Sequence, residues 1–290
     1  MKKVYIHIGI GKTGTSSIQK MMKDNQEKLK LNGVLYPLAH LHPSGAQHIL
    51  ADFKNENMSD KIKDLFEKCK NEYDSINATS MILSAEGFCF CKQKYIDSLK
   101  NIFIGWNVKI IFYIRNQVDI LKSSYLQAVK ANTTEFTTFD EYYKRSRGAF
   151  KYTQRIEGWS NAFGKEAIIV KNYDDIKVKN GGGGEGDLLH DFSQTCNIKS
   201  FVDLNKSYRE NESIISEFIT LTRTINSLQI DDKIKKSLIQ EIVSLSKTFK
   251  VYTNSKNLFI KEGNEEISRF FLEDNLLFTN NYLANNEVNK

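Results

Sequence analysis

The chain of 290 residues is 40% hydrophobic and 11% aromatic, which is enough apolar material for a large core and excludes an intrinsically disordered protein. Its formal net charge of +6 comes from lysines spread along the sequence, so no concentrated basic block indicates nucleic-acid binding. A modest positive excess suits a small polyanionic ligand or an acidic polymer, which the field would steer into a cleft.

Signals for a membrane span or a disulfide framework are weak. No apolar run approaches the ~20 residues needed to cross a bilayer, so we expect no integral membrane segment and leave peripheral membrane contact open. The charged Lys12 interrupts the first apolar run, which we interpret as a strand and not as a signal peptide. Four irregularly spaced cysteines, without a CxxC pair, favour a cytoplasmic protein. Cys89 and Cys91 lack further ligands, so we expect no bound metal.

Apolar runs predict four buried strands, at residues 4–10, 80–85, 108–114 and 167–173. Helical spacing of apolar residues follows at 16–31 and 117–130, and helical patterns alone occur from residue 211 onward. Strands that alternate with helices predict an α/β fold in three layers, with a parallel sheet between helices and a helical C-terminal layer.

The sequence gives no sign of a linker between domains. Its two prolines form no Pro-rich segment, so we expect a single domain over 1–290, with an α/β core at 1–175 and a mainly helical part at 176–290. The glycine run at 181–184 predicts a mobile surface loop, and a closing lid is the alternative.

The segment GIGKTGTSS, residues 9–17, links the first strand to the first helix. Gly11-Lys12-Thr13 matches the end of a Walker A motif, but that motif requires a glycine five positions before Gly11, where Ile6 stands. The long Walker loop is therefore excluded. A shorter, P-loop-like turn remains, whose backbone N–H groups, hydroxyls and following helix N-terminus converge on an anion beside Lys12.

The loop also has a purely structural interpretation. The alternative to a phosphate site is a glycine turn in which Thr15 or Ser16 is the helix N-cap.

A second candidate phosphate contact follows a later strand. Arg115 stands where the strand 108–114 ends, and Ser123 follows it by eight residues. Since the carboxyl ends of parallel strands share one edge, Arg115 is expected to face a second phosphate near the first, although such an arginine alone is more often in a surface ion pair.

Together these two stretches resemble the signatures of the sulfotransferase family, which uses 3′-phosphoadenosine 5′-phosphosulfate (PAPS) as sulfuryl donor. In that family a loop of the type PKTGTT binds the 5′-phosphosulfate, and GKTGTSS matches it with Gly11 in place of the usual proline. Arg115 and Ser123 match the family's 3′-phosphate site in type and spacing. The stretches SAEGF, YTQRIEGWSNAFG and NESIISEFITLTRTIN resemble the bacterial carbohydrate-sulfotransferase branch, so the likeness extends over most of the chain.

The resemblance implies a nucleotide-binding role for the core 1–175 and a role for each motif residue. Lys12 would contact the bridging oxygen and stabilise the leaving phosphate, while Arg115 and Ser123 would hold the 3′-phosphate. The 5′-phosphate would be held by the loop residues Gly11, Thr13, Gly14, Thr15 and Ser16. The implied reaction is transfer of a sulfuryl group, without a metal, to a hydroxyl or amine of a glycan or glycolipid, with adenosine 3′,5′-bisphosphate (PAP) as product.

A hydroxyl acceptor must lose a proton during transfer, and members of the family use either Glu or His as the base. Glu86 stands at the carboxyl end of the strand 80–85, on the expected ligand edge. His48 lies in a loop-helix expected above the same edge, and His40 and His42 precede it. His7, which alternates within the first strand, is predicted to be a packed core histidine.

Two other functions fit parts of the sequence. A P-loop nucleotide kinase or other phosphotransferase is favoured by Gly11-Lys12-Thr13 but opposed by Ile6 and by the lack of a Walker B acid. A noncatalytic protein that binds an acidic polymer or nucleic acid is the second alternative.

Overall fold

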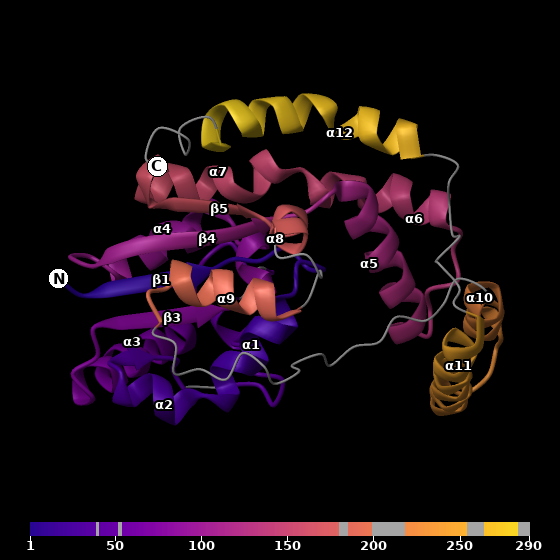
Figure 1. Cartoon of the computed structure of the whole chain (residues 1–290), viewed down its shortest axis with the longest axis horizontal. Coiled ribbons are helices and arrows are strands. Elements are labelled where there is room, and N and C mark those ends of the chain that lie inside the picture. The colour runs from indigo at the N-terminus through magenta and orange to yellow at the C-terminus, as the bar shows by residue number, and fades with distance from the viewer. Residues whose placement is uncertain (39–40, 52–53, 180–184, 199–217, 254–263, 284–290) are drawn as a thin grey trace. The chain divides into compact units, whose positions relative to one another are not determined.

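The computed structural model describes residues 1–38, 41–51, 54–179, 185–198, 218–253 and 264–283 (Figure 1). The glycine run 181–184 and His40 lie outside the described residues. The chain divides into two compact units. The first comprises 1–115, 152–210 and 274–290, and the second comprises 116–151 and 211–273. The units are interleaved along the sequence, and the expectation of a single domain stays a prediction.

A five-stranded parallel sheet forms the centre of the first unit, in the order β2-β3-β1-β4-β5. Its strands are β1 (Lys3–His7), β2 (Val34–Leu35), β3 (Ser80–Ser84), β4 (Asn107–Ile114) and β5 (Ile168–Asn172). The α/β fold with a parallel sheet is thus confirmed, and the four predicted strands are present with shifted ends. The sequence did not predict β2, because two residues carry no periodicity.

Helices connect the strands of the first unit. They are α1 (Thr15–Asp24), α2 (Gln26–Leu31), α3 (Asp60–Ser75), α4 (Gln93–Ile102), α7 (Tyr152–Phe163), α8 (Tyr173–Lys179) and α9 (Glu185–Thr195). Short 3₁₀ turns add η1 (His48–Leu50), η2 (Glu86–Phe90) and η4 (Lys165–Ala167), and a π turn, η6, spans Thr279–Leu283. None of the described helices is both long and apolar enough to cross a membrane.

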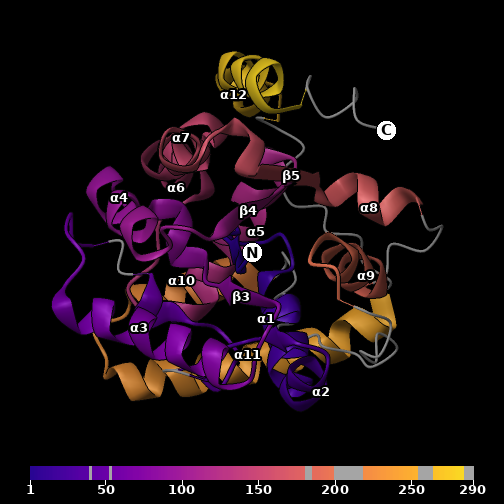
Figure 2. The ribbon, with the colours of Figure 1, turned by 90° about the vertical axis from the view of Figure 1, so that its left-hand side faces the viewer.

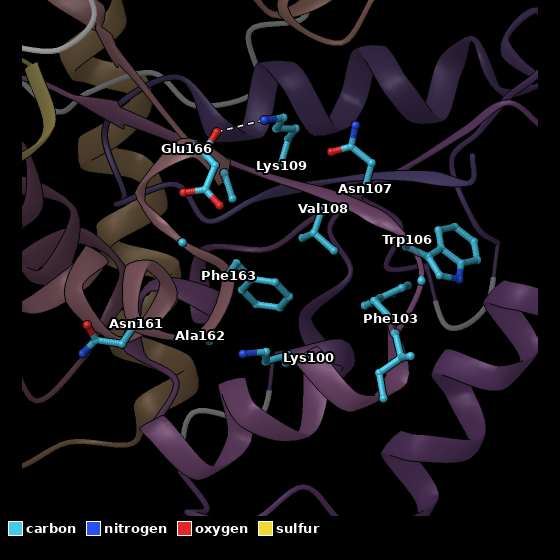
Figure 3. Close-up of a pocket in the computed structure, with 14 residues that line it drawn as sticks. Lys100, Phe103, Trp106, Asn107, Val108, Lys109, Asn161, Ala162, Phe163 and Glu166 are labelled. Carbon is cyan, nitrogen blue, oxygen red and sulfur yellow. Dashed lines mark hydrogen bonds between the residues drawn. The ribbon is translucent and has the colours of Figure 1, made fainter.

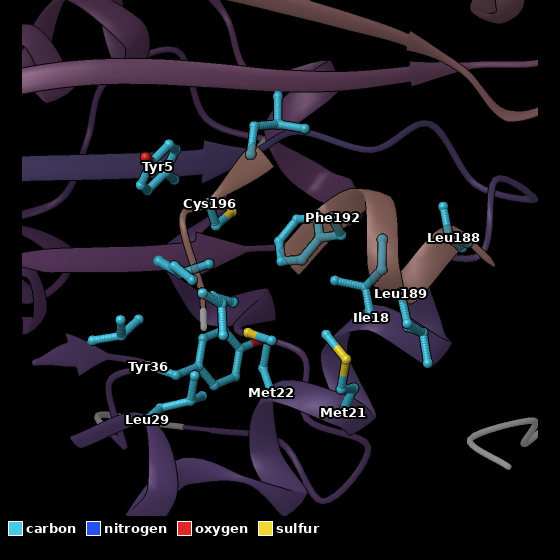
Figure 4. Packing of buried hydrophobic residues seen from close by; sticks show 14 of the residues in the cluster. Tyr5, Ile18, Met21, Met22, Leu29, Tyr36, Leu188, Leu189, Phe192 and Cys196 are labelled. Atoms are coloured by element: carbon cyan, nitrogen blue, oxygen red, sulfur yellow. The ribbon is translucent and has the colours of Figure 1, made fainter. Parts of the chain in front are cut away.

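The sheet buries both of its faces because successive strand residues point to opposite sides. On one side, Tyr5 of β1 and Tyr113 of β4 pack against Ile18 of α1 and Phe192 of α9 (Figure 4). On the other side lie α4 and α7 (Figure 2). There Phe112 of β4 meets Tyr152 edge to face. Each such side chain contributes about 1.5–3 kcal/mol on full burial. Because helices cover both faces of the sheet, its strands are apolar along nearly their whole length, as the sequence predicted.

The strand order places β1 at a topological switch point. After β1 the chain forms β2 and β3 on one side of it, and then β4 and β5 on the other. Ligands of open parallel sheets bind outside the carboxyl ends of the strands at such a point. The loop after His7 therefore occupies the expected place for a ligand site.

The second unit is helical. Its elements are α5 (Gln117–Ala131), α6 (Phe139–Ser146), η3 (Arg147–Phe150), α10 (Ile219–Ser227) and α11 (Asp232–Thr253), and α12 (Asn264–Phe278) begins in it and ends in the first unit. Tyr125 and Val129 of α5 pack with Ile225 of α10 and with Ile239 and Ile242 of α11. The helices predicted from residue 211 onward are confirmed where the chain is described, from Ile219.

Candidate active site

The loop between β1 and α1 has an unusual backbone. Lys12 has φ 73° and Gly14 has φ 79°, so two of its residues are left-handed. A non-glycine residue in that region costs roughly 1–2 kcal/mol, and such strain is concentrated at functional sites. Gly14, and not Thr15 or Ser16, is the N-cap of α1, and no side chain accepts a hydrogen bond from the first N–H groups of the helix. The helix N-terminus therefore faces its ligand edge without an internal cap.

Two hydroxyls of the loop are directed into the protein. The Oγ1 of Thr13, a fully buried residue, donates a hydrogen bond of 2.7 Å to the Ile10 carbonyl. The Oγ1 of Thr15 is also buried, beside Gly9, where an added Cβ would lie 2.7 Å from it and 2.9 Å from His7 Nε2. Thr13 and Thr15 would thus offer a phosphate their backbone N–H groups, whereas Ser16 is half-buried.

His7 lies beneath the loop in a polar network. Its ring is fully buried, as predicted, and its Nδ1 lies 2.9 Å from Ser84 Oγ. The Gln19 amide of α1 also donates to this hydroxyl, at 3.2 Å. Burial lowers the pKa of His7 to about 3, so its imidazole is neutral at physiological pH. This network ties the start of α1 to the carboxyl ends of β1 and β3.

Arg115 reaches the loop from the end of β4. Its Nη1 donates a hydrogen bond of 3.1 Å to the carbonyl of Lys12, and its guanidinium lies 5.4 Å from the Tyr173 ring centre. Asp174 Oδ1 lies 3.5 Å from its Nε. The main-chain N–H of Arg115 donates to the Tyr152 hydroxyl at 3.1 Å. The structure therefore brings together the ends of β1 and β4, as the sequence indicated, and adds residues that follow β5.

Ser123 belongs to the second unit, where it is half-buried on α5. Its part in a phosphate site stays a prediction, as do the binding roles of the other predicted residues. Tyr173 and Asp174 were missed by the sequence analysis. Tyr173 ends the predicted strand 167–173 and Asp174 follows it, so the sequence indicates a strand end there but not which strand lies beside it.

Glu86 lies against the loop on the side of β3. It is the first residue of η2, and a Cβ added to Gly11 would lie 3.5 Å from its Oε2. Burial raises the pKa of the Glu86 carboxyl, and the nearby Lys12 ammonium opposes that rise. A raised pKa makes the ionised carboxylate a stronger base.

His48 is exposed and forms the first residue of η1. Its ring centre lies 5.5 Å from that of His42, and partial burial, with a smaller effect of His42, lowers its pKa. The neighbouring Gln47 exchanges hydrogen bonds with Ser84, its N–H donating at 3.1 Å and its Oε1 accepting at 2.8 Å. The segment therefore lies at the end of β3, as expected, although the His48 side chain is exposed.

A cavity of about 600 Å³ lies elsewhere, at the opposite edge of the sheet (Figure 3). It is lined by the start of β4, from Asn107 to Lys109, and by the ends of α4 and α7. At the rim of the cavity, Lys109 Nζ donates a hydrogen bond of 2.8 Å to the Glu166 carbonyl. The full length of β4 separates this cavity from Arg115, and it contains none of the predicted site residues.

Comparisons with known proteins gave likenesses to a curated protein and to solved structures. No protein-family model matches the chain. An uncharacterised protein of Archaeoglobus fulgidus is 26% identical over 227 residues, which are 68% of this chain and 60% of that protein. The chain thus spans about 60% of that relative's length. The crystal structure of a sulfotransferase from Alicyclobacillus acidocaldarius superposes with a TM-score of 0.42 at 14% identity, over 86% of this chain and 96% of that one.

Proposed function

We propose that this chain is a PAPS-dependent sulfotransferase that transfers a sulfuryl group to a hydroxyl or amine of a glycan or glycolipid. The observation that supports this most directly is the hydrogen bond from Arg115 to the carbonyl of Lys12. It fixes a guanidinium fork relative to a loop that carries its own ammonium group. PAPS has separate 5′ and 3′ anionic groups, and two cationic side chains at a fixed spacing suit such a ligand.

The loop fits the 5′-phosphosulfate in its backbone as well as in its charge. A turn with left-handed residues at Lys12 and Gly14 is the kind of backbone that forms an anion-binding nest. The start of α1 has no side-chain cap, so its N–H groups and the helix dipole are directed at the ligand edge. Thr13, Gly14, Thr15 and Ser16 would hold the phosphate mainly through these backbone groups.

PAPS, when bound, supplies the activated sulfuryl group. The Lys12 ammonium would stabilise negative charge on the phosphate of the donor as it leaves, which is a contribution made in the transition state. The Glu86 carboxylate, beside Gly11, would take the proton of the acceptor hydroxyl. Lys12 lies in the loop that follows β1 and Glu86 in the turn that follows β3, so the sheet would limit reorganisation during transfer.

Glu86 is the better candidate for the base. Its carboxylate contacts the loop region, whereas His48 presents an exposed ring. We infer that Glu86→Gln, which keeps the shape and removes the basicity, abolishes turnover and leaves PAP binding intact. If His48→Ala has that effect and Glu86→Gln does not, the assignment passes to His48.

The function is tested by calorimetric binding of PAP and of ATP with magnesium to the whole chain. We expect PAP to bind more tightly, and Arg115→Ala to weaken PAP binding by about 10- to 100-fold, because a hydrogen bond from a charged group contributes about 1.5–3 kcal/mol. Lys109→Ala, at the opposite edge of the sheet, is the matched control and should change nothing.

Tighter binding of ATP would contradict the proposal and favour a phosphotransferase.

A sulfate mass shift in a glycan or lipid extract incubated with PAPS and the protein would identify the acceptor. A cytoplasmic location, which the proposal includes, agrees with the four free cysteines of the chain.

A further inference from the structure

Arg155, on α7, is a half-buried arginine that forms no ion pair with the described residues. Its guanidinium carbon lies 4.8 Å from the centre of the Phe90 ring, and its Nε is buried without a hydrogen-bond acceptor. Within the part of the chain that the structure describes, Arg155 forms no ion pair or hydrogen bond. Arg145, by contrast, pairs with the buried Glu135. Arginines are seldom buried without such a partner, because the guanidinium has five donors to satisfy.

Two groups near Arg155 act on its charge without forming an ion pair or a hydrogen bond with it. Burial lowers the pKa of its guanidinium, and the nearest groups that oppose this effect are Cys89 and Asp274. Cys89 is a buried thiol whose pKa is itself raised by burial. One oxygen of Asp274 accepts a hydrogen bond of 2.7 Å from the Tyr152 N–H. A cation in this state is poised for an anionic ligand from outside the chain.

Arg155 belongs to the same edge of the sheet as the candidate active site. It lies three residues after Tyr152, which contacts the main chain of Arg115 at the end of β4. Phe90, on which its guanidinium stacks, is the last residue of η2, and Glu86 is the first. At about 2 Å of rise per residue, the two ends of this 3₁₀ turn are roughly 8 Å apart, which is within the span of a sugar ring and its substituents.

We propose that Arg155 binds a carboxylate of the acceptor, so that the acceptor of this enzyme is an acidic sugar. This inference rests on the proposed function. Phe90 stacks on one face of the guanidinium, so a ligand would bind the two terminal nitrogens in the plane, the geometry that a two-oxygen carboxylate fills. A single fork carries one positive charge, which matches a carboxylate better than a doubly charged phosphate. The carboxylate would hold the sugar so that a neighbouring hydroxyl reaches Glu86.

The test uses two acceptors that differ only in this group, p-nitrophenyl β-D-glucuronide and p-nitrophenyl β-D-glucoside. Their binding is measured by calorimetry with saturating PAP, and their sulfation by mass spectrometry with PAPS. We expect the protein to bind the glucuronide at least tenfold more tightly. Arg155→Gln should remove this preference by raising the KM for the glucuronide, with kcat and the affinity for PAP unchanged.

Arg147→Gln is the matched control, because Arg147 also stacks on an aromatic ring, Phe270, at 4.2 Å, but belongs to the second unit. It should retain the preference. If Arg155→Gln does not fold, Arg155→Lys carries the test and should keep a reduced preference, since it preserves the charge without the fork.

Equal binding of the two glycosides, binding of neither, or a preference that survives Arg155→Gln would overturn the inference. These outcomes leave the proposed function standing as long as PAP binds. Failure of PAP to bind the unaltered chain would instead remove the proposed function itself.

Discussion

Gly14→Ala separates two contributions of one glycine to the stability of the loop. Gly14 has φ 79°, a conformation in which an alanine costs roughly 1–2 kcal/mol. In addition, an added Cβ would lie 2.1 Å from Leu188 Cδ2, so that side chain would have to move. Leu188 is 3% exposed within the core between α1 and α9, and overpacking of such a core costs about 1–3 kcal/mol. Together these costs should lower the free energy of unfolding by about 2–5 kcal/mol.

Gly105→Ala supplies the control for this experiment. Gly105 has the same φ of 79°, but no heavy atom lies within 4 Å of an added Cβ. Its substitution should therefore cost only the backbone part. Urea unfolding followed by fluorescence reports on both variants, because Trp106 and Trp159 lie in the same unit as the two glycines. The difference between the variants measures packing against Leu188, and equal losses in both would refute this reasoning.

Two further predictions concern pH. Burial lowers the pKa of His7 from 6.5 to about 3, so up to about 5 kcal/mol of stability present above pH 6.5 is lost as the pH falls toward 3. Its NMR signals should not titrate between pH 5 and 8, and a midpoint near 6.5 would contradict the assignment. For Glu86 the sign is opposite, because a raised native pKa contributes stability that is present below pH 4.5 and lost as the pH rises through the raised value. Thermal unfolding should show that the melting temperature of Glu86→Gln rises relative to that of the unaltered chain between acidic and neutral pH. A difference in melting temperature that does not change with pH would contradict the prediction.

The elements that the sequence predicted well are those with a local signal. Each long buried strand is an apolar run, and residues 117–130 carry enough periodicity to mark α5 within one residue. The expected helix at 16–31 is instead two helices, which meet at Asn25. The Asn25 side chain is buried and donates a hydrogen bond of 2.9 Å to the Met21 carbonyl, which also accepts the main-chain N–H of Asn25 at 3.2 Å. The hydrophobic pattern of the sequence does not predict a break of this kind between two helices.

The candidate site divides in the same way. The loop around Lys12 is contiguous in sequence, and its glycines and hydroxyls mark it directly. Which way each hydroxyl turns was not predictable, because it depends on Gly9 leaving room for Thr15 beside His7. The contact of Asp174 with Arg115 was missed for a different reason, since it requires β5 to lie beside β4. Strand neighbours are decided by long-range packing, which no short pattern encodes.

Under the proposed function, the strand order would let one edge of the sheet bind both a donor and an acceptor. Because β1 lies between β3 and β4, the loop that carries Lys12 has Glu86 on one side and Arg115 on the other. In the proposed function, the phosphate-binding groups and the base therefore lie on opposite sides of the loop. Under that proposal, a donor held across Lys12 and Arg115 would leave the Glu86 side for the acceptor. In-line transfer needs attacking and leaving oxygens on opposite sides of the moving group, and under the proposed function this order of strands would supply that separation before any ligand binds.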